Sequence, residues 1–104
     1  MTFVVRFSAS ADEDLQRLLD FLIDRAQTHE DLDLAQLAME AVRSTALAQL
    51  ATTPFSFRKT ANSPTRRELI IPFGATGYVA LHEIASPSSV LVLAVRHQRE
   101  ADYH

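Results

Sequence analysis

The side chains best suited to chemistry lie at the end of the chain, where Arg96, His97, Arg99 and Tyr103 follow an apolar run. An arginine can bind phosphate, a histidine titrates near neutral pH and a tyrosine carries a hydroxyl, so Arg96, His97 and Tyr103 could form an acid–base set. Adjacent strand residues point to opposite faces, which separates Arg96 from His97 unless the chain bends. The alternatives are a solvated tail and a protein interface.

A second group of functional interest is basic. Arg58, Lys59, Arg66 and Arg67 lie in a stretch, residues 58–67, that contains no acidic residue. Such a patch favours contact with a nucleic acid or with an acidic partner. A solvated basic loop explains it equally well, so both interpretations stay open.

No metal or cofactor site is expected. The chain has no cysteine, and His82 and Glu83 should point to opposite faces of a strand. Gly74 and Gly77 lie between two predicted strands instead of before a helix. They therefore indicate a hairpin turn and not a phosphate-binding loop.

The chain is predicted to begin with a strand and a helix. Thr2–Phe7 is rich in β-branched and aromatic residues, as strands are. Ser10 with Glu13 matches a capping box at a helix start. The helix that follows has an apolar stripe at helical spacing, made of Leu15, Leu18, Leu19, Leu22 and Ala26.

A second helix should follow a polar turn. Thr28–Asp33 predicts the turn, with Asp31 or Asp33 as the N-cap, and the helix is expected over about Leu34–Leu50. Its many alanines would allow another helix to approach closely. The two helices together indicate an antiparallel helical hairpin.

The second half of the chain is predicted to form a loop over residues 55–65 and then a meander. Two turns of four residues, 74–77 and 86–89, separate the three strands of this meander. The strands cover Arg67–Phe73, Tyr78–Ile84 and Val90–Val95.

The expected fold is therefore α+β, in the order β-α-α-β-β-β, with the helical hairpin packed on one face of a mainly antiparallel sheet. Residues 1–104 should form one domain, and the first strand could lie at either edge of the meander. The side chains expected to be buried are Leu15, Leu18, Leu22, Val42, Leu50, Leu69, Ile71, Val79, Leu81, Leu91 and Leu93.

The composition and charge of the chain disfavour some classes of function. The chain has 104 residues, 47% of them hydrophobic, and a formal net charge of −3. The acidic balance disfavours direct nucleic-acid binding, because each neutralised phosphate needs a cation. The sequence contains no apolar run of about 18 residues and no visible signal peptide, so we expect a cytoplasmic protein that does not bind membranes.

Several segments resemble the RelE/ParE superfamily of toxins from type II toxin–antitoxin modules. They are the opening VRFSASADEDL, the PF…R…REL entry to the meander, the IPFG-x-x-GY hairpin and the ending VLVLAVRHQREADY. The resemblance covers nearly the whole chain, and the hairpin and the ending are its most specific parts. The last two segments look most similar to the ParE, or plasmid-stabilisation, branch.

The resemblance implies two different activities, depending on the branch. RelE-like members are ribosome-dependent mRNA endonucleases, whereas ParE-like members poison DNA gyrase. RelE-like nucleases carry cations at alternate positions of the strand before the first hairpin and just after its Gly-Tyr pair. The matching residues here are Ile70, Pro72 and Val79, none of which is charged. The ParE-like interpretation is therefore favoured.

A ParE-like toxin would inhibit gyrase and be neutralised by a cognate antitoxin in a hetero-oligomer, with no catalytic residue and no cofactor. Arg96, Arg99 and Tyr103 would then bind the target. In the alternative RelE-like mRNA endonuclease, Arg96, His97 and Tyr103 would be catalytic. A further alternative is a non-toxic module that binds an antitoxin or regulates DNA.

Overall fold

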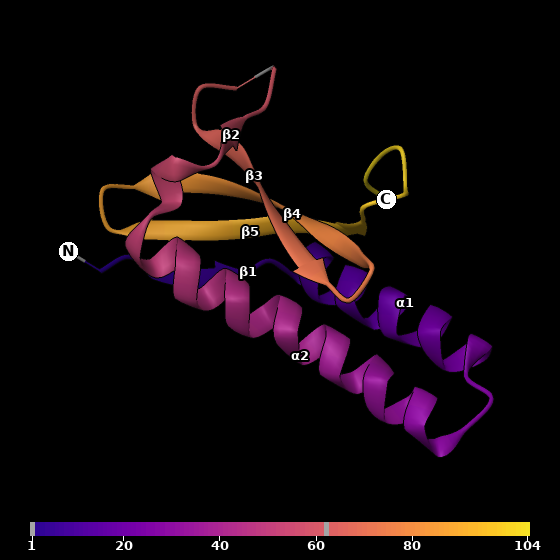
Figure 1. The fold of residues 1–104 in the computed structure, drawn as a ribbon. Coiled ribbons are helices and arrows are strands. Elements are labelled where there is room, and N and C mark those ends of the chain that lie inside the picture. The colour runs from indigo at the N-terminus through magenta and orange to yellow at the C-terminus, as the bar shows by residue number, and fades with distance from the viewer. Residues whose placement is uncertain (1, 62) are drawn as a thin grey trace.

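The computed structural model describes residues 2–61 and 63–104; Met1 and Asn62, the latter inside the expected loop, lie outside the described residues. Two helices cover one face of a five-stranded mixed sheet, which confirms the expected α+β class (Figure 1). The elements in chain order are β1 Val4–Phe7, α1 Ala9–Arg25, α2 His29–Thr52, the 3₁₀ helix η1 Pro54–Ser56, β2 Arg58–Lys59, β3 Arg66–Phe73, β4 Thr76–Ser86 and β5 Ser89–His97.

Helix α1 starts two residues earlier than the capping-box pattern predicted. Ser8 is the N-cap: its Oγ accepts a hydrogen bond from the Ala11 N–H at 3.0 Å and donates one to the Leu93 carbonyl at 3.0 Å. Ser10, the expected cap, is already inside the helix. The prediction was wrong because the hydrogen bond of Ser8 to β5 fixes the helix start. This contact joins residues far apart in the chain, so the local sequence around Ser8 does not reveal it.

Helix α2 also starts earlier than expected. Thr28 is its N-cap and accepts a hydrogen bond from the Asp31 N–H at 3.1 Å, so the predicted start at Leu34 and the predicted caps Asp31 and Asp33 are wrong. The polar residues assigned to a turn form the first helical turn, where Glu30 and Asp31 oppose the positive end of the helix dipole. Among the described residues, no helix is both long enough and apolar enough to cross a membrane.

The strand order is β1-β5-β4-β3-β2, with β1 parallel to β5 and every other pair antiparallel. The first strand therefore lies beside the last one. The expected loop over residues 55–65 instead contains part of η1 and the short strand β2. The two hairpin turns are shorter than predicted, since only residues 74–75 and 87–88 lie outside the strands. Gly74 has φ +59°, which a tight hairpin turn requires at its first position.

The core lies between the helices and the sheet. Leu15, Leu18, Val42, Leu50, Leu69 and Ile71 are buried there as expected, whereas Leu22 is only partly buried against this core. Val79 is also buried as expected, but on the face of the sheet that carries no helix. Leu81, Leu91 and Leu93 are only partly buried, because they point to the face that carries no helix. On β5 the buried side chains are Val90, Val92, Ala94 and Val95, and the expected burial of Leu91 and Leu93 was wrong.

One buried carboxylate joins α1 to the sheet. Asp14 is 6% exposed, and its Oδ2 accepts a hydrogen bond from the Val95 N–H at 2.8 Å. Strand β1 pairs with β5 only as far as Val92, so the Val95 N–H lies beyond the end of β1. Asp14 thus satisfies a main-chain group that the parallel strand does not reach.

Candidate functional site

Glu68 is the centre of a polar cluster on the helix-free face of the sheet. Arg58 from β2 donates to Glu68 Oε1 from its Nε at 3.0 Å, and the Tyr103 hydroxyl donates to Oε2. Arg96 from β5 places its Nη2 4.0 Å from the same Oε2. One carboxylate therefore joins two strands and the C-terminal tail, which are far apart in sequence.

The tail after β5 folds back onto the molecule, so the solvated tail considered above is not what the structure shows. Arg96 Nη1 donates to the Glu100 carbonyl at 2.7 Å, and its guanidinium lies 5.2 Å from the Tyr103 ring centroid. The Glu100 carboxylate pairs with Arg17 of α1 at 2.9 Å. The tail is thus held to both the sheet and α1.

The charges of the tail are set by these contacts. Burial raises the pKa of the Tyr103 phenol, and the hydrogen bond to Glu68 raises it further, so Tyr103 stays protonated as a donor. Burial also acts to raise the pKa of Glu100, but the hydrogen bond and charge of Arg17 outweigh this effect. The pKa of Glu100 therefore lies below its usual range, and the carboxylate stays ionised.

His97 lies on the opposite face, toward the helices. Its Nε2 is 2.7 Å from Thr76 Oγ1, its Nδ1 accepts from the Arg99 N–H at 3.0 Å, and its ring lies edge-on to Tyr78 with centroids 5.3 Å apart. Because Nδ1 accepts a hydrogen bond, the proton of the neutral ring is on Nε2 and points to Thr76. Both ring nitrogens are therefore already engaged.

The structure does not bring the residues of the acid–base set together. Arg96 and Tyr103 contact Glu68 on the helix-free face, whereas His97 contacts Thr76 and Tyr78 on the helix face. Arg99, the other expected target-binding residue, lies with His97 in a hollow beside α1. Sequence alternation alone predicted the separation of Arg96 from His97.

The basic residues of the second half are divided as well. Arg58 pairs with Glu68 and Arg66 pairs with Glu83, whose Oε1 is 3.5 Å from Arg66 Nε. Arg67 points to the helix face and donates to the Phe57 carbonyl at 2.9 Å. The exposed residue Lys59 is its neighbour in the β2–β3 register. The four cations do not form one surface. Among residues 2–61 and 63–104, no group of three or more His, Asp or Glu side chains could hold a metal ion.

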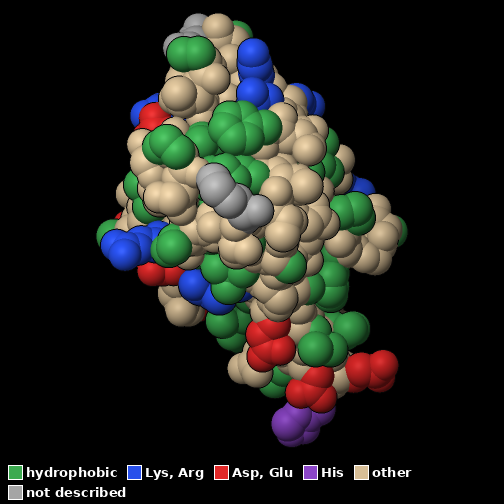
Figure 2. Space-filling view, turned by 90° about the vertical axis from the view of Figure 1, so that its left-hand side faces the viewer, with side chains coloured by type: hydrophobic (Ala, Val, Ile, Leu, Met, Phe, Trp, Pro, Cys, Tyr) green, Lys and Arg blue, Asp and Glu red, His purple; other side chains and the backbone are tan. Residues whose placement is uncertain are grey.

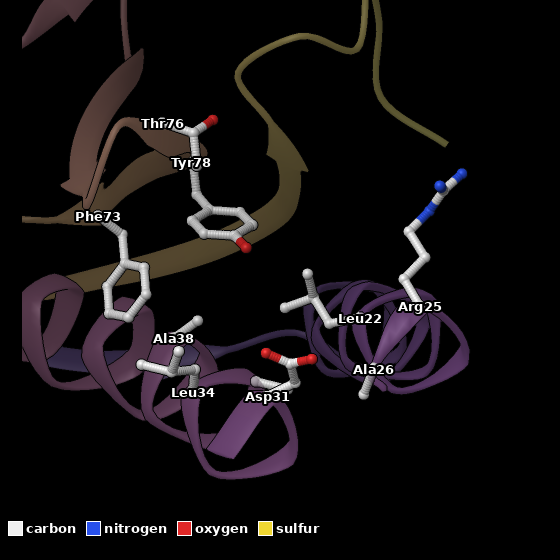
Figure 3. A pocket seen from close by; sticks show the side chains of 10 residues that line it. Leu22, Arg25, Ala26, Asp31, Leu34, Ala38, Phe73, Thr76 and Tyr78 are labelled. Carbon is white, nitrogen blue, oxygen red and sulfur yellow. The ribbon is translucent and has the colours of Figure 1, made fainter. Parts of the chain in front are cut away.

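A groove that the sequence analysis missed runs between the helices and the β3–β4 hairpin. It consists of two hollows of about 350 Å³ and 550 Å³, which share Leu22, Arg25, Thr76 and Tyr78. In Figure 3 the Tyr78 side chain points into this space, facing the Leu22 and Asp31 side chains of the two helices. Burial raises the pKa of Tyr78, so its hydroxyl stays protonated. The available signal was Phe21, an apolar residue outside the stripe of the first helix.

Comparison with solved structures shows that the fold is that of toxin–antitoxin proteins. A chain of the chromosomal ParDE system from P. aeruginosa matches 92% of this chain and 96% of its own length, with TM-score 0.71 and 11% identity. A chain of the RelBE2 complex from Mycobacterium tuberculosis matches 96% of this chain and 95% of its own length, with TM-score 0.61 and 20% identity.

The sequence comparisons identify the family. Residues 5–102 match the family model of the ParE toxin of the type II toxin–antitoxin system parDE. The chain is also 33% identical over 100 residues to Toxin RelE1 of Caulobacter vibrioides, covering 96% of this chain and 98% of that protein. The chain therefore belongs to the ParE toxin family of type II toxin–antitoxin systems.

Proposed function

We propose that this toxin acts as a ParE-like inhibitor of DNA gyrase, binding its target without catalysing a reaction, and that a cognate antitoxin neutralises it. The observation that carries this proposal is the chemistry of the helix-free face. Ile70 and Val79 lie opposite each other in the β3–β4 register, with Pro72 two residues further along β3. Transfer of a phosphoryl group needs cations placed where charge develops, and these three side chains offer none.

A cation beside this apolar patch, Arg96, is already engaged. Arg96 lies opposite Val79 in the β4–β5 register, and its guanidinium contacts Glu68 and the Glu100 carbonyl. His97, which would have to move a proton, is on the other face. This face has an apolar centre next to an arginine, Arg96, and a tyrosine of the tail, Tyr103. Such a composition is typical of protein-binding surfaces, where arginine and tyrosine contribute much of the binding energy.

The antitoxin is proposed to use the free edge of β3 and the helix face. Strand β2 pairs only with Arg67 and Glu68. The Arg66 carbonyl faces β2, so strand alternation places the main-chain groups of Ile70 and Pro72 at the outer edge beyond β2. Pro72 has no N–H, which limits uncontrolled pairing with other strands. A strand of the antitoxin could still pair with Ile70 there.

A supercoiling assay tests the proposal. Purified toxin, freed from antitoxin, should stop gyrase from supercoiling relaxed plasmid and leave cleaved DNA bound to the enzyme. Addition of the antitoxin should restore supercoiling. Unchanged supercoiling at toxin concentrations that arrest growth in cells would refute gyrase as the target.

The second candidate is a ribosome-dependent mRNA endonuclease. It is favoured by the name of the Toxin RelE1 relative and by the presence of Arg96, His97 and Tyr103 near the end of β5. Cutting of ribosome-bound message by the purified toxin, lost in His97→Gln, would establish this candidate and exclude the first. General acid–base groups contribute about 10²–10⁴-fold to such rates, so the loss would be easily measured.

A further inference from the structure

We propose that Glu68 decides which class of ligand the helix-free face of the sheet accepts. Its carboxylate fills an anion site built by Arg58, Arg96 and Tyr103, so the phosphates of a nucleic acid are kept out and the face is left to a protein partner. This inference goes beyond the proposed function, because it concerns what the face excludes, whichever protein is the target. Three observations carry it: the donors around the carboxylate, their separate anchors and the charge of the face.

Two arginines and a phenol surround the Glu68 carboxylate. Arg58 approaches Oε1 through both Nε and Nη2, each at 3.0 Å. The Tyr103 hydroxyl donates to Oε2, and Arg96 Nη2 lies 4.0 Å from the same oxygen. Guanidinium and hydroxyl groups are also the donors with which proteins bind phosphate oxygens. The carboxylate therefore lies where a phosphate would otherwise bind.

The donors have anchors other than Glu68. Arg96 Nη1 donates to the Glu100 carbonyl at 2.7 Å, and the Glu100 carboxylate pairs with Arg17 of α1 at 2.9 Å. These two contacts hold the tail, and with it Tyr103, against the sheet and the helix. Strand β2 is held separately by its main-chain pairing with β3. The site should therefore keep its shape when the carboxylate loses its charge.

The cluster is shielded from water, which makes its charges matter. The Arg96 and Glu68 side chains are 13% and 16% exposed, so solvent screens their charges only in part. The Arg96 Nε is buried and has no acceptor among the described residues. With Glu68 charged, a phosphate would have to enter beside a like charge and break its hydrogen bonds. Without that charge, the guanidinium lacks a counter-ion and a bound anion becomes favourable.

The negative net charge of the chain does not by itself keep phosphate from this face. Figure 2 shows acidic side chains gathered at the tip of the helical hairpin, at the bottom of the view, and Lys and Arg side chains over the upper part. On the helix-free face the arginines outnumber the carboxylates. The charged strand residues that share this face are Arg6, Arg58, Arg66, Arg96, Glu68 and Glu83. Such a surplus attracts nucleic acid, so a local carboxylate is needed to reject it.

Binding of a phosphate-bearing probe by the Glu68→Gln toxin tests the inference. This substitution keeps the size of the side chain and an oxygen acceptor but removes the charge. The probe is a short fluorescent oligouridylate, titrated with full-length toxin freed from antitoxin and followed by fluorescence anisotropy. Glu83→Gln is the matched control, because it removes the same charge from the same face, where Glu83 pairs with Arg66 at 3.5 Å.

We expect Glu68→Gln to bind the probe at least about tenfold more tightly than the wild type, because charge-assisted hydrogen bonds to phosphate become available. Glu83→Gln should change the affinity much less. Adding Arg96→Gln to Glu68→Gln should abolish the gain. Raising the salt concentration should weaken the binding of Glu68→Gln, as it does for phosphate contacts in general.

Inorganic phosphate gives a second measurement, which also serves if Glu68→Gln is poorly folded. A ligand of the folded state raises its stability, so phosphate should raise the Tm of Glu68→Gln relative to potassium chloride of the same ionic strength. Phosphate also stabilises proteins in general, and the Tm increases of the wild type and of Glu83→Gln measure that shared effect. The increase for Glu68→Gln should exceed both.

Three outcomes would overturn the inference. Equal probe affinities of Glu68→Gln and Glu83→Gln would mean that the loss of either charge has the same effect. A wild-type toxin that binds the probe as tightly as Glu68→Gln would mean that the carboxylate excludes nothing. A Glu68→Gln toxin that gains neither affinity for the probe nor extra stability in phosphate would mean that no anion site is present. Neither gyrase nor antitoxin is present in these experiments, so failure of the proposed target leaves their result unchanged, and the reverse holds too.

Discussion

Asp14 should be the most important polar side chain for the stability of this fold. Asp14→Ala removes the acceptor of the Val95 N–H, which is 2.8 Å away and beyond the reach of β1. Arg17 also loses a carboxylate whose Oδ1 lies 3.9 Å from its Nη2. The substitution leaves the main-chain group of β5 without a partner under α1, where water does not readily replace the carboxylate.

The expected cost follows from the type of hydrogen bond. A hydrogen bond to a charged group contributes about 1.5–3 kcal/mol, and an orphaned buried donor costs a similar amount. In a domain of about 100 residues, each kcal/mol lowers Tm by roughly 4–8 °C. Asp14→Ala should therefore lower Tm by about 6–24 °C. Asp14→Asn keeps an oxygen acceptor and should cost only about half as much.

Urea and thermal denaturation of the purified toxin at neutral pH measure these differences. Asp20→Ala is the control, because Asp20 is in the same helix and the hydrogen bond that its carboxylate accepts from Gln16 is exposed. That variant should stay within about 0.5 kcal/mol of the wild type. If Asp14→Ala melts within the error of Asp20→Ala, the buried carboxylate does not hold α1 on β5, and the reasoning is refuted.

Three further predictions concern pH, close packing and the tail. Burial lowers the pKa of His82, so the unfolded chain binds a proton at higher pH than the folded chain does. The free energy of unfolding should therefore fall as the pH drops below about 6.5. Urea titrations of His82→Gln should show a smaller fall. A Cβ at Gly77 would lie 2.9 Å from the Ile71 carbonyl, so Gly77→Ala should cost about 1–3 kcal/mol by the same titration. Tyr103→Ala should weaken growth arrest in cells while circular dichroism stays native, whereas His97→Gln should arrest growth normally; the reverse ranking would indicate a nuclease.

The element types could be predicted from the sequence because local periodicity decides them. The leucine stripe of α1 and the alternation of side-chain types along β3 can be read from the local sequence, without knowing which elements pack against them. The first residues of the helices could not be predicted in this way. Ser8 is the N-cap of α1 instead of Ser10 because its hydroxyl also donates to a carbonyl of β5, 85 residues away. The phase of β5 was missed for a related reason: its run of valines and leucines is apolar on both faces, so nothing local shows which face meets the helices.

The candidate site was predicted in part. Alternation correctly separated Arg96 from His97, because it depends only on strand geometry. The contact of Tyr103 with Glu68 could not be foreseen, since the path of a polar tail is set by tertiary contacts with Arg17 and Arg96. The groove was missed because the stripes of both helices were assigned to one core, whereas their far ends extend beyond the sheet.

The parallel pairing of β1 with β5 has a consequence for when the toxin becomes active. Val5 pairs with Val90, so the sheet joins the two ends of the chain. During synthesis, at roughly 5–20 residues per second, the helical hairpin can form early from local contacts, but β1 has no neighbouring strand until β5 leaves the ribosome. We therefore expect the nascent chain to be harmless to the cell that makes it. The toxin can complete its fold only once β5 has emerged, when an antitoxin already present can bind it at once.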